Sequence, residues 1–204
     1  MSALTMLAGM SDAAIARWIA GELTAALAHG PVAITVPGGS TPFPILAELA
    51  RASLDWRRIT VWPGDDREVP EDHPASNVGR IRALLEPAGA TVVALKPHMI
   101  PRQFALTWLG MGLDGHVASL FPSTDPRADA AREVIRIVPD PLPPEAPFSR
   151  LSLTIPALLA SDAVMFVLRG EDKLALFQAA ARGENDLPVA RLLRAARSPV
   201  TCFT

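Results

Sequence analysis

Cysteine is almost absent from this chain, and neither sign of charge prevails. Cys202 is the only cysteine among 204 residues, which excludes an internal disulfide and a metal site built from several cysteines. Because Cys202 lies in an apolar stretch near the end of the sequence, we expect its side chain to be buried. The formal net charge is −2, so electrostatics give no reason to expect binding to nucleic acid or to an anionic membrane.

Long hydrophobic runs are also missing. Residues 1–10 carry no basic flank of the kind that a secretory signal has, and Arg17, Glu22 and His29 interrupt the apolar residues that follow. No stretch is a convincing transmembrane helix. We therefore expect a cytoplasmic protein. The sequence also lacks a His-x-x-x-His pattern and a cysteine pair, which argues against a metal site.

The composition that remains is that of an ordinary globular protein. Half of the residues are hydrophobic and a fifth are charged, and 204 residues suffice for a substantial core. We predict a single α/β domain over residues 1–204. Of the twenty prolines, a cluster within residues 139–147 forbids regular structure there. We interpret that segment as a long surface loop inside the domain, because its flanks are strand-like.

Helical and strand patterns alternate along the chain. Ile15, Ile19, Leu23 and Leu27 form one apolar stripe of a helix. The predicted helices cover Asp12–Ala28, Phe43–Arg51 and Glu171–Arg182, and a further helix capped by Ser76 or Asn77 runs to about Glu86. The predicted strands cover Val32–Val36, Arg58–Trp62, Thr91–Leu95, Phe104–Leu109, Glu133–Val138, Leu151–Thr154, Ala163–Leu168 and, at a sheet edge, Val200–Phe203. This alternation predicts a three-layer α/β/α, Rossmann-like fold around a mostly parallel sheet, with a polar loop over residues 63–74.

The first functional motif, Gly38-Gly39-Ser40-Thr41-Pro42, stands between the first buried strand and a helix. Thr41 suits the N-cap and Pro42 the first helical position. Unpaired N–H groups at a helix start favour a bound phosphate, and Ser40 and Thr41 add hydroxyl donors. The motif is neither a Walker loop nor a dinucleotide fingerprint. Taken alone, it is as well explained by a tight, capped turn; its position after the first buried strand favours phosphate binding.

A polar segment, Asp65–Pro70, follows the next strand, and Asn77 stands beyond it. Polar loops after strands commonly carry function, although solvated charge would explain this one equally well. Arg67 is the candidate, because a guanidinium matches two phosphate oxygens at once. Two further cations, Arg150 at the start of a strand and Lys173 at the start of a helix, are surface charges by default and could complete an anion site.

The most informative motif follows the apolar run Phe104–Leu109. Three glycines occur within the next six residues, and Asp114 and His116 stand among them. Glycine lets backbone N–H groups approach a ligand closely, and an imidazole titrates near neutral pH. In α/β proteins such loops lie at the carboxyl edge of the sheet, where ligands bind. We therefore predict that His116 and Asp114 are catalytic residues.

These motifs, in this order, resemble those of the 6-phosphogluconolactonases, which are relatives of the glucosamine-6-phosphate deaminases. The deaminases place tyrosine where Arg67 and Asn77 stand, so the lactonases are the better match. The matching segments are the phosphate loop Gly38–Pro42, the segment Asp65–Pro70 with Ser76–Asn77, the catalytic loop Gly112–Pro122 and, more weakly, Arg150–Thr154 and Gly170–Lys173.

The resemblance implies hydrolysis of the δ-lactone of 6-phosphogluconate in the oxidative pentose phosphate pathway. His116 would act as general base toward water and then as general acid, with Asp114 orienting the loop or the imidazole. The implied enzyme needs no cofactor or metal and is a monomer or weak homodimer whose partner is a small sugar-phosphate lactone. The residues implied to bind substrate and phosphate are Gly38, Gly39, Ser40, Thr41, Arg67, Asn77, Gly112, Gly115, Arg150 and Lys173.

Two alternatives stay open. One is a deaminase or isomerase of amino-sugar phosphates, with Asp65 as a carboxylate base; the other is a sugar-phosphate binding protein without turnover. The segment Leu85–Gln103 is shorter than in the lactonases, which have an extra helix there, so we expect a wall of the pocket or part of a subunit contact to be missing. Asp66 replaces the usual glutamate and Val117 a frequent threonine.

Overall fold

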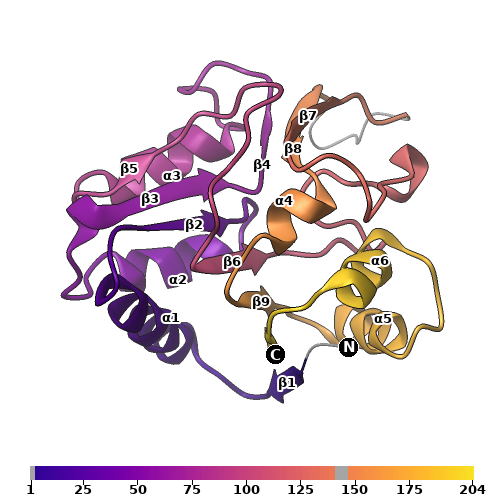
Figure 1. Cartoon of the computed structure of the whole chain (residues 1–204), viewed down its shortest axis with the longest axis horizontal. Helices are drawn as coiled ribbons and strands as arrows, with labels where there is room; N and C mark the ends of the chain where they lie inside the picture. The colour runs from indigo at the N-terminus through magenta and orange to yellow at the C-terminus, as the bar shows by residue number, and fades with distance from the viewer. Residues whose placement is uncertain (1–2, 141–146) are drawn as a thin grey trace.

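The computed structural model describes residues 3–140 and 147–204. Its main sheet has seven strands in the order β1-β10-β9-β6-β2-β3-β5, and all neighbouring strands are parallel (Figure 1). The predicted α/β fold with a mostly parallel sheet is confirmed. The strands of this sheet are β1 (Leu4–Leu7), β2 (Val32–Val36), β3 (Ile59–Pro63), β5 (Thr91–Val92), β6 (Leu106–Leu109), β9 (Val164–Val167) and β10 (Val200–Phe203).

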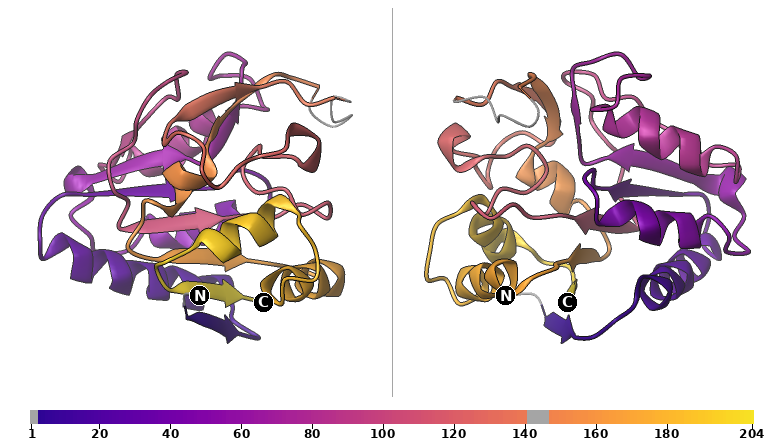
Figure 2. Two further views of the ribbon diagram at one scale, coloured as in Figure 1. Left: turned by 45° about the vertical axis from the view of Figure 1, so that its right-hand side comes forward. Right: turned by 180° about the vertical axis from the view of Figure 1, so that it is seen from behind.

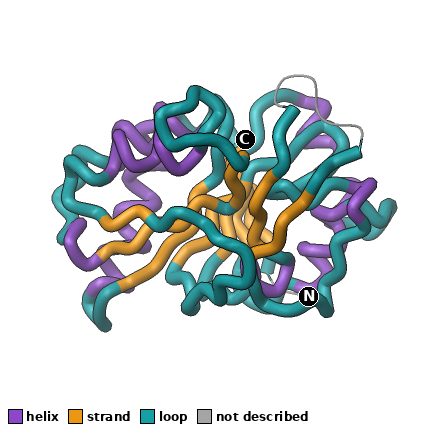
Figure 3. The backbone as a smooth tube through the Cα atoms, turned by 90° about the horizontal axis from the view of Figure 1, so that it is seen from above, coloured by secondary structure: helices purple, strands orange, loops and turns teal. Residues whose placement is uncertain are grey.

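Helices cover both faces of the sheet, as the tube in Figure 3 shows. Alternate residues of each strand point to opposite faces, so Leu106 and Trp108 of β6 pack with α1–α3, whereas Phe166 of β9 packs with α4–α6. These two cores make the fold three-layered. The helices are α1 (Asp12–Leu27), α2 (Pro42–Leu49), α3 (Asn77–Leu85), α4 (Ile155–Leu159), α5 (Glu171–Ala181) and α6 (Pro188–Ala195), and short 3₁₀ turns cover Trp56–Arg58 and Pro122–Thr124.

A second, antiparallel sheet stands beside the first (Figure 2) and has the order β4-β8-β7. Its strands are β4 (Asp65–Arg67), β7 (Val134–Ile137) and β8 (Arg150–Leu153). Strands were predicted near the positions of β7 and β8, but no second sheet was predicted. The prediction that residues 63–74 form only a loop is wrong for β4. Polar residues conceal this strand in the sequence, because Asp65 and Asp66 are buried here through hydrogen bonds rather than apolar contacts.

Strand β10 lies inside the main sheet, between β1 and β9, so the prediction that Val200–Phe203 forms an edge is wrong. The edge is β1, which the sequence pattern did not reveal because most of its side chains are exposed. Strand pairing supplies its stability instead, in register with the whole of β10. Cys202 of β10 is fully buried, as predicted.

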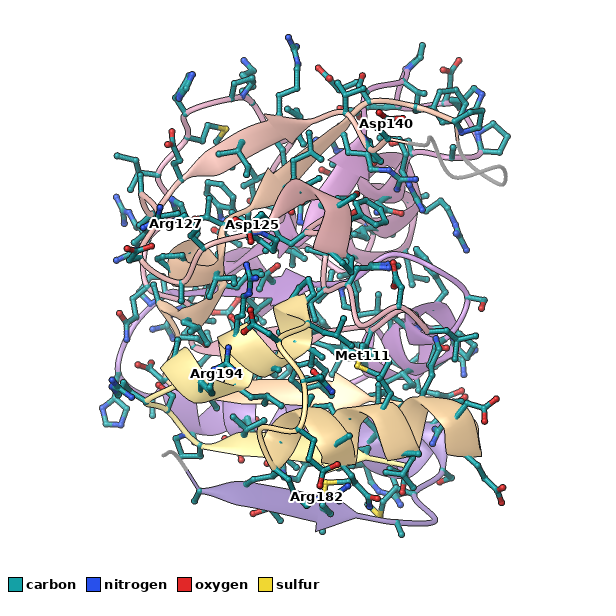
Figure 4. The ribbon with its side chains drawn as sticks, turned by 90° about the vertical axis from the view of Figure 1, so that its right-hand side faces the viewer. Met111, Asp125, Arg127, Asp140, Arg182 and Arg194 are labelled. Atoms are coloured by element: carbon teal, nitrogen blue, oxygen red, sulfur yellow. The ribbon has the colours of Figure 1, made fainter. Side chains whose placement is uncertain are left out.

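Helices α4 and α6 were not predicted, because both are short and each starts with a proline in its first turn. Ion pairs fasten α6 to the chain around it. Arg191 pairs with Asp125 at 2.5 Å and with Asp186 at 2.8 Å, and Arg194 also pairs with Asp186. Figure 4 labels Asp125 and Arg194 on this side of the molecule.

The predicted proline-rich loop lies only partly within the described residues. Pro139 and Pro147 belong to no helix or strand, whereas Pro141, Pro143 and Pro144 lie outside the described residues. Among the residues that are described, no helix has the length and hydropathy that crossing a membrane requires.

Candidate active site

A cavity of about 280 Å³ lies where the central strands of the main sheet end. The chain leaves β2 toward β3 on one side and leaves β6 toward β9 on the other, and such a switch point is where α/β proteins bind ligands. The loops after β2, β3, β6 and β9 therefore meet at this place. The lining residues are Pro37, Gly38, Gly39, Ser40, Thr41, Pro42, Asp65, Arg67, Asn77, Trp108, Gly110, Met111, Gly112, His116, Ala118, Val167 and Lys173.

The loop Gly38–Thr41 forms one wall. Thr41 occupies the N-cap position of α2, as predicted, but its hydroxyl makes no capping hydrogen bond. The backbone N–H groups of this loop donate no hydrogen bond to any residue that the structure describes. Donors at the positive end of a helix are therefore available to an anion. The loop also packs tightly, because a Cβ on Gly38 would lie 2.1 Å from Oδ1 of Asn77.

Arg67 belongs to a chain of hydrogen bonds that reaches Ser119 in the loop Gly112–Pro122. Its Nη1 donates to Oδ1 of Asn77 at 2.7 Å, and Nδ2 of Asn77 donates to the carbonyl of Asp65 at 2.9 Å. Oδ2 of Asp65 accepts from the hydroxyl of Ser119 at 2.5 Å. Among the described residues, the side-chain hydrogen bonds of Arg67 all come from Nη1, and its Nε is buried without a partner, which leaves Nη2 as the terminal nitrogen available to a ligand.

Asp66 accepts hydrogen bonds from the first backbone N–H groups of α3, whose N-cap is Ser76, and does not line the cavity. Its Oδ1 accepts from the backbone N–H of Asn77 at 2.6 Å and of Arg67 at 2.8 Å, and its Oδ2 accepts from that of Val78 at 3.2 Å. Burial raises the pKa of Asp66 above its usual range, and the charge of Asp65 adds to this, although the three backbone hydrogen bonds oppose it. Asp66 therefore holds α3 against β4, where the sequence left its role open.

His116 and Asp114 are hydrogen-bonded, with Nδ1 of the imidazole 2.6 Å from Oδ1 of the carboxylate. Sequence spacing alone did not establish this contact. Burial raises the pKa of Asp114, but the hydrogen bond and charge of His116 outweigh it, so the pKa of Asp114 lies below its usual range. An ionised carboxylate only accepts, which makes Nδ1 the donor, and the neutral form of the ring then carries its lone pair on Nε2. The ring also contacts Phe121, with 4.7 Å between centroids.

Lys173 lies in the first turn of α5 and lines the cavity. A cation in the first turn opposes the helix dipole, so this position weakens the helix while it supplies charge to the site. Glu171 and Asp172, which precede Lys173 in the same turn, carry the negative charge that the N-terminus of a helix favours.

Three predicted site residues lie outside the cavity wall. Asp114 stands behind His116. Gly115 has a left-handed backbone, with φ of 77°, and its missing Cβ makes room for Leu187. Arg150 is only 4% exposed, and its guanidinium carbon lies 5.4 Å from the centre of the Phe121 ring. Burial lowers the pKa of Arg150, as does the charge of Arg67, while Asp65 raises it.

Sequence reasoning missed the apolar part of the wall. Trp108 and Val167 stand at the ends of strands whose following loops were predicted, and that position could have revealed them. Ala118 carried no signal: its φ of 51° is uncommon for a residue other than glycine. Residues 85–103 do not line this cavity. Residues 99, 100, 102 and 103 line a separate cavity of about 660 Å³ beside the opposite ends of β2 and β6.

The described residues contain no group of three or more His, Cys, Asp or Glu side chains that could hold a metal ion. Fold and site together define an α/β protein with a His–Asp pair and a crevice lined by cationic side chains and unpaired backbone N–H groups at the switch point of its sheet.

Comparison with known proteins narrows this class. The family model of glucosamine-6-phosphate isomerases/6-phosphogluconolactonase matches residues 10–101 and 89–201. The chain is 35% identical to a 6-phosphogluconolactonase of Pseudomonas aeruginosa, over 89% of this chain and 86% of that one. It is 33% identical to one of Caulobacter vibrioides, over 92% and 89%. The crystal structure of a 6-phosphogluconolactonase from Shewanella baltica has a TM-score of 0.81 at 26% identity and covers all of this chain and 97% of that one. The chain belongs to the glucosamine-6-phosphate isomerase/6-phosphogluconolactonase family.

Proposed function

We propose that this protein is a 6-phosphogluconolactonase, a hydrolase that opens 6-phospho-D-glucono-1,5-lactone to 6-phosphogluconate in the oxidative pentose phosphate pathway. The names of its relatives support this reaction. The observation that carries it is the shared cavity: anion-binding donors and one imidazole line the same space. That arrangement suits a substrate with a phosphate at one end and a carbonyl at the other.

The phosphate binds to the loop Gly38–Thr41, Nη2 of Arg67 and the ammonium of Lys173. Each of these donors lines the cavity, and the loop and Nη2 have no hydrogen bond to other described residues. Phosphate lies far from the bond that breaks, so its binding positions the lactone carbonyl for attack rather than taking part in the chemistry.

His116 acts as general base. Asp114 fixes the tautomer, so Nε2 takes a proton from the water that attacks the carbonyl carbon. The imidazolium then gives a proton to the ring oxygen as the carbon–oxygen bond breaks. Backbone N–H groups of the glycine loop stabilise the carbonyl oxygen while it carries negative charge. All of these groups belong to one chain, so the proposed mechanism can operate in a monomer or in a weak homodimer.

The test is hydrolysis of freshly made 6-phosphogluconolactone, followed by acid release at constant pH. We expect protein to accelerate the reaction in proportion to its concentration, well above spontaneous opening. Decay at the spontaneous rate, with tight binding of 6-phosphogluconate, would instead identify a sugar-phosphate binding protein.

One observation favours a second candidate, a deaminase or isomerase of amino-sugar phosphates. Asp65 lines the cavity and is 7% exposed, so a carboxylate base is present. Its Oδ2 is engaged by Ser119, which is why we rank this candidate lower. Ammonia release from glucosamine 6-phosphate, measured beside the lactone assay, decides between the two.

A further inference from the structure

The imidazole of His116 has three close neighbours, and only one of them, Asp114, holds it by a hydrogen bond. The ring of Phe121 lies against its face, at 4.7 Å between centroids and 41° between planes. The backbone of Gly112 is so close that a Cβ there would lie 2.2 Å from Cε1 of the imidazole. Phe121 does not line the cavity.

The hydrogen bond alone does not fix the plane of the ring. The side chains of His116 and Asp114 are 32% and 50% exposed, so solvent competes for the bond and leaves both free to turn. A contact on the face restricts tilt about the Nδ1–Oδ1 axis, which a single hydrogen bond permits. Phe121 is itself supported, since the buried guanidinium of Arg150 lies within cation–π distance of its ring.

We propose that Phe121 is a positioning residue, whose ring clamps the His116 imidazole against Gly112 so that the hydrogen bond to Asp114 persists and Nε2 keeps its direction. The kinetic consequence rests on the proposed function. The clamp itself is a property of the free protein and can be measured without any substrate.

The experiment compares wild type, Phe121→Ala, Phe121→Tyr and Phe148→Ala. Phe148 is the matched control, because its ring contacts His73 at 5.3 Å and lies outside the cavity. Nitrogen-15 spectra of the histidine rings report the tautomer of His116 in each protein, and circular dichroism checks that each is folded. We expect wild type, Phe121→Tyr and Phe148→Ala to show one tautomer with Nδ1–H, and Phe121→Ala to show a mixture.

In the lactone assay, we expect Phe121→Ala to lower kcat by about 10- to 100-fold with KM changed less than about twofold. Phe121→Tyr should retain most of the wild-type kcat, because tyrosine keeps the ring, and Phe148→Ala should leave kcat unchanged. A single Nδ1–H tautomer in folded Phe121→Ala would overturn the proposal, and so would a kcat within about twofold of wild type. If wild type shows no lactonase activity, the proposed function fails while the spectra still decide whether the clamp exists. If Phe121→Ala does not fold, Phe121→Leu takes its place with the same expected mixture, because leucine fills space without a flat face.

Discussion

At the scale of single residues, Gly112 lies so close to the imidazole of His116 that it has no room for a side chain. A Cβ at this position would lie 2.3 Å from Nδ1 of His116 and 2.6 Å from Oδ1 of Asp114. Gly112→Ala must therefore displace the pair. We expect lactone turnover to fall by about 10- to 100-fold, while binding of 6-phosphogluconate, measured by calorimetry, changes little.

Gly21→Ala is the matched control for this change. Gly21 lies in α1 with nothing within 4 Å of its added Cβ, so turnover should stay the same and the free energy of unfolding should rise by about 0.5–1 kcal/mol. Full activity in Gly112→Ala would contradict the placement of the imidazole.

Arg67 makes a separate prediction about binding. Because a hydrogen bond to a charged group contributes about 1.5–3 kcal/mol, Arg67→Ala should raise KM by about 10- to 100-fold with kcat largely retained, since phosphate is remote from the chemistry. Initial rates over a range of lactone concentrations measure both. Arg136→Ala, which removes an exposed arginine paired with Glu68, should alter neither. A fall in kcat at unchanged KM would show that Arg67 acts in the chemical step.

At this scale the sequence indicated residue types better than it indicated contacts. Glycine loops, Arg67 and Lys173 were recognisable, because their chemistry follows from type and from position at strand or helix ends. The bond from Ser119 to Asp65 and the contact of Phe121 with His116 join residues on different elements or across a turn. No local pattern encodes them.

Among elements, α6 and its N-cap residue Leu187 contact the loop Gly112–Pro122 at Gly115. The N–H of Val189 donates to the carbonyl of Gly115 at 3.1 Å, and a Cβ on Gly115 would lie 2.8 Å from Cδ1 of Leu187. Gly115→Ala also forces a side chain into a left-handed backbone. We expect the free energy of unfolding to fall by about 1–3 kcal/mol, measured by urea denaturation, and turnover to fall with it.

A double-mutant cycle isolates the contact between the loop and α6. Leu187→Ala alone removes packing and should also destabilise. In the double variant the shortened side chain relieves part of the clash, so the loss should be smaller than the sum of the two single losses. Strict additivity would show that α6 does not buttress the loop.

The sequence predicted elements more reliably than their partners. Val32–Val36 is largely β-branched and Ala163–Leu168 is continuously apolar, and these runs contain strands β2 and β9 of the main sheet. β4, in contrast, is polar and three residues long, and it is a strand only because β8 pairs with it. That pairing joins segments far apart in the chain, which periodicity does not report.

At the scale of the whole molecule, Cys202 reports on the integrity of the sheet. It is fully buried in β10, between β1 and β9, and burial raises the pKa of its thiol to about 12. We expect a thiol reagent such as DTNB to react with the native protein only as fast as it unfolds, and immediately in denaturant. Rapid reaction of the native protein would contradict the buried position of β10.

The same pKa predicts a dependence of stability on pH. A raised pKa in the folded state means that the unfolded thiol, with an ordinary pKa of about 8.5, ionises first as the pH rises. The contribution of Cys202 to stability is therefore complete below the pKa of the unfolded thiol and decreases as the pH rises from there toward the pKa of the folded thiol. Urea denaturation of wild type and Cys202→Ala across this range should show a steeper decline for wild type.

The fold as a whole brings the motifs together because parallel strands direct their following loops to one edge of the sheet. The sequence could therefore predict that Gly38–Thr41 and His116 share a crevice, once the strands before them were recognised. It could not predict that Arg150 lies behind Phe121, because the antiparallel sheet that carries Arg150 is fixed by tertiary packing.

We propose above all that one ligand contacts the loop Gly38–Thr41 and the imidazole of His116 at the same time. The most direct measurement pairs lactone hydrolysis with calorimetric binding of 6-phosphogluconate, in wild type and in His116→Ala. We predict that His116→Ala loses catalysed hydrolysis and binds 6-phosphogluconate within a few-fold of wild type. Catalysis retained in full by His116→Ala would contradict the account.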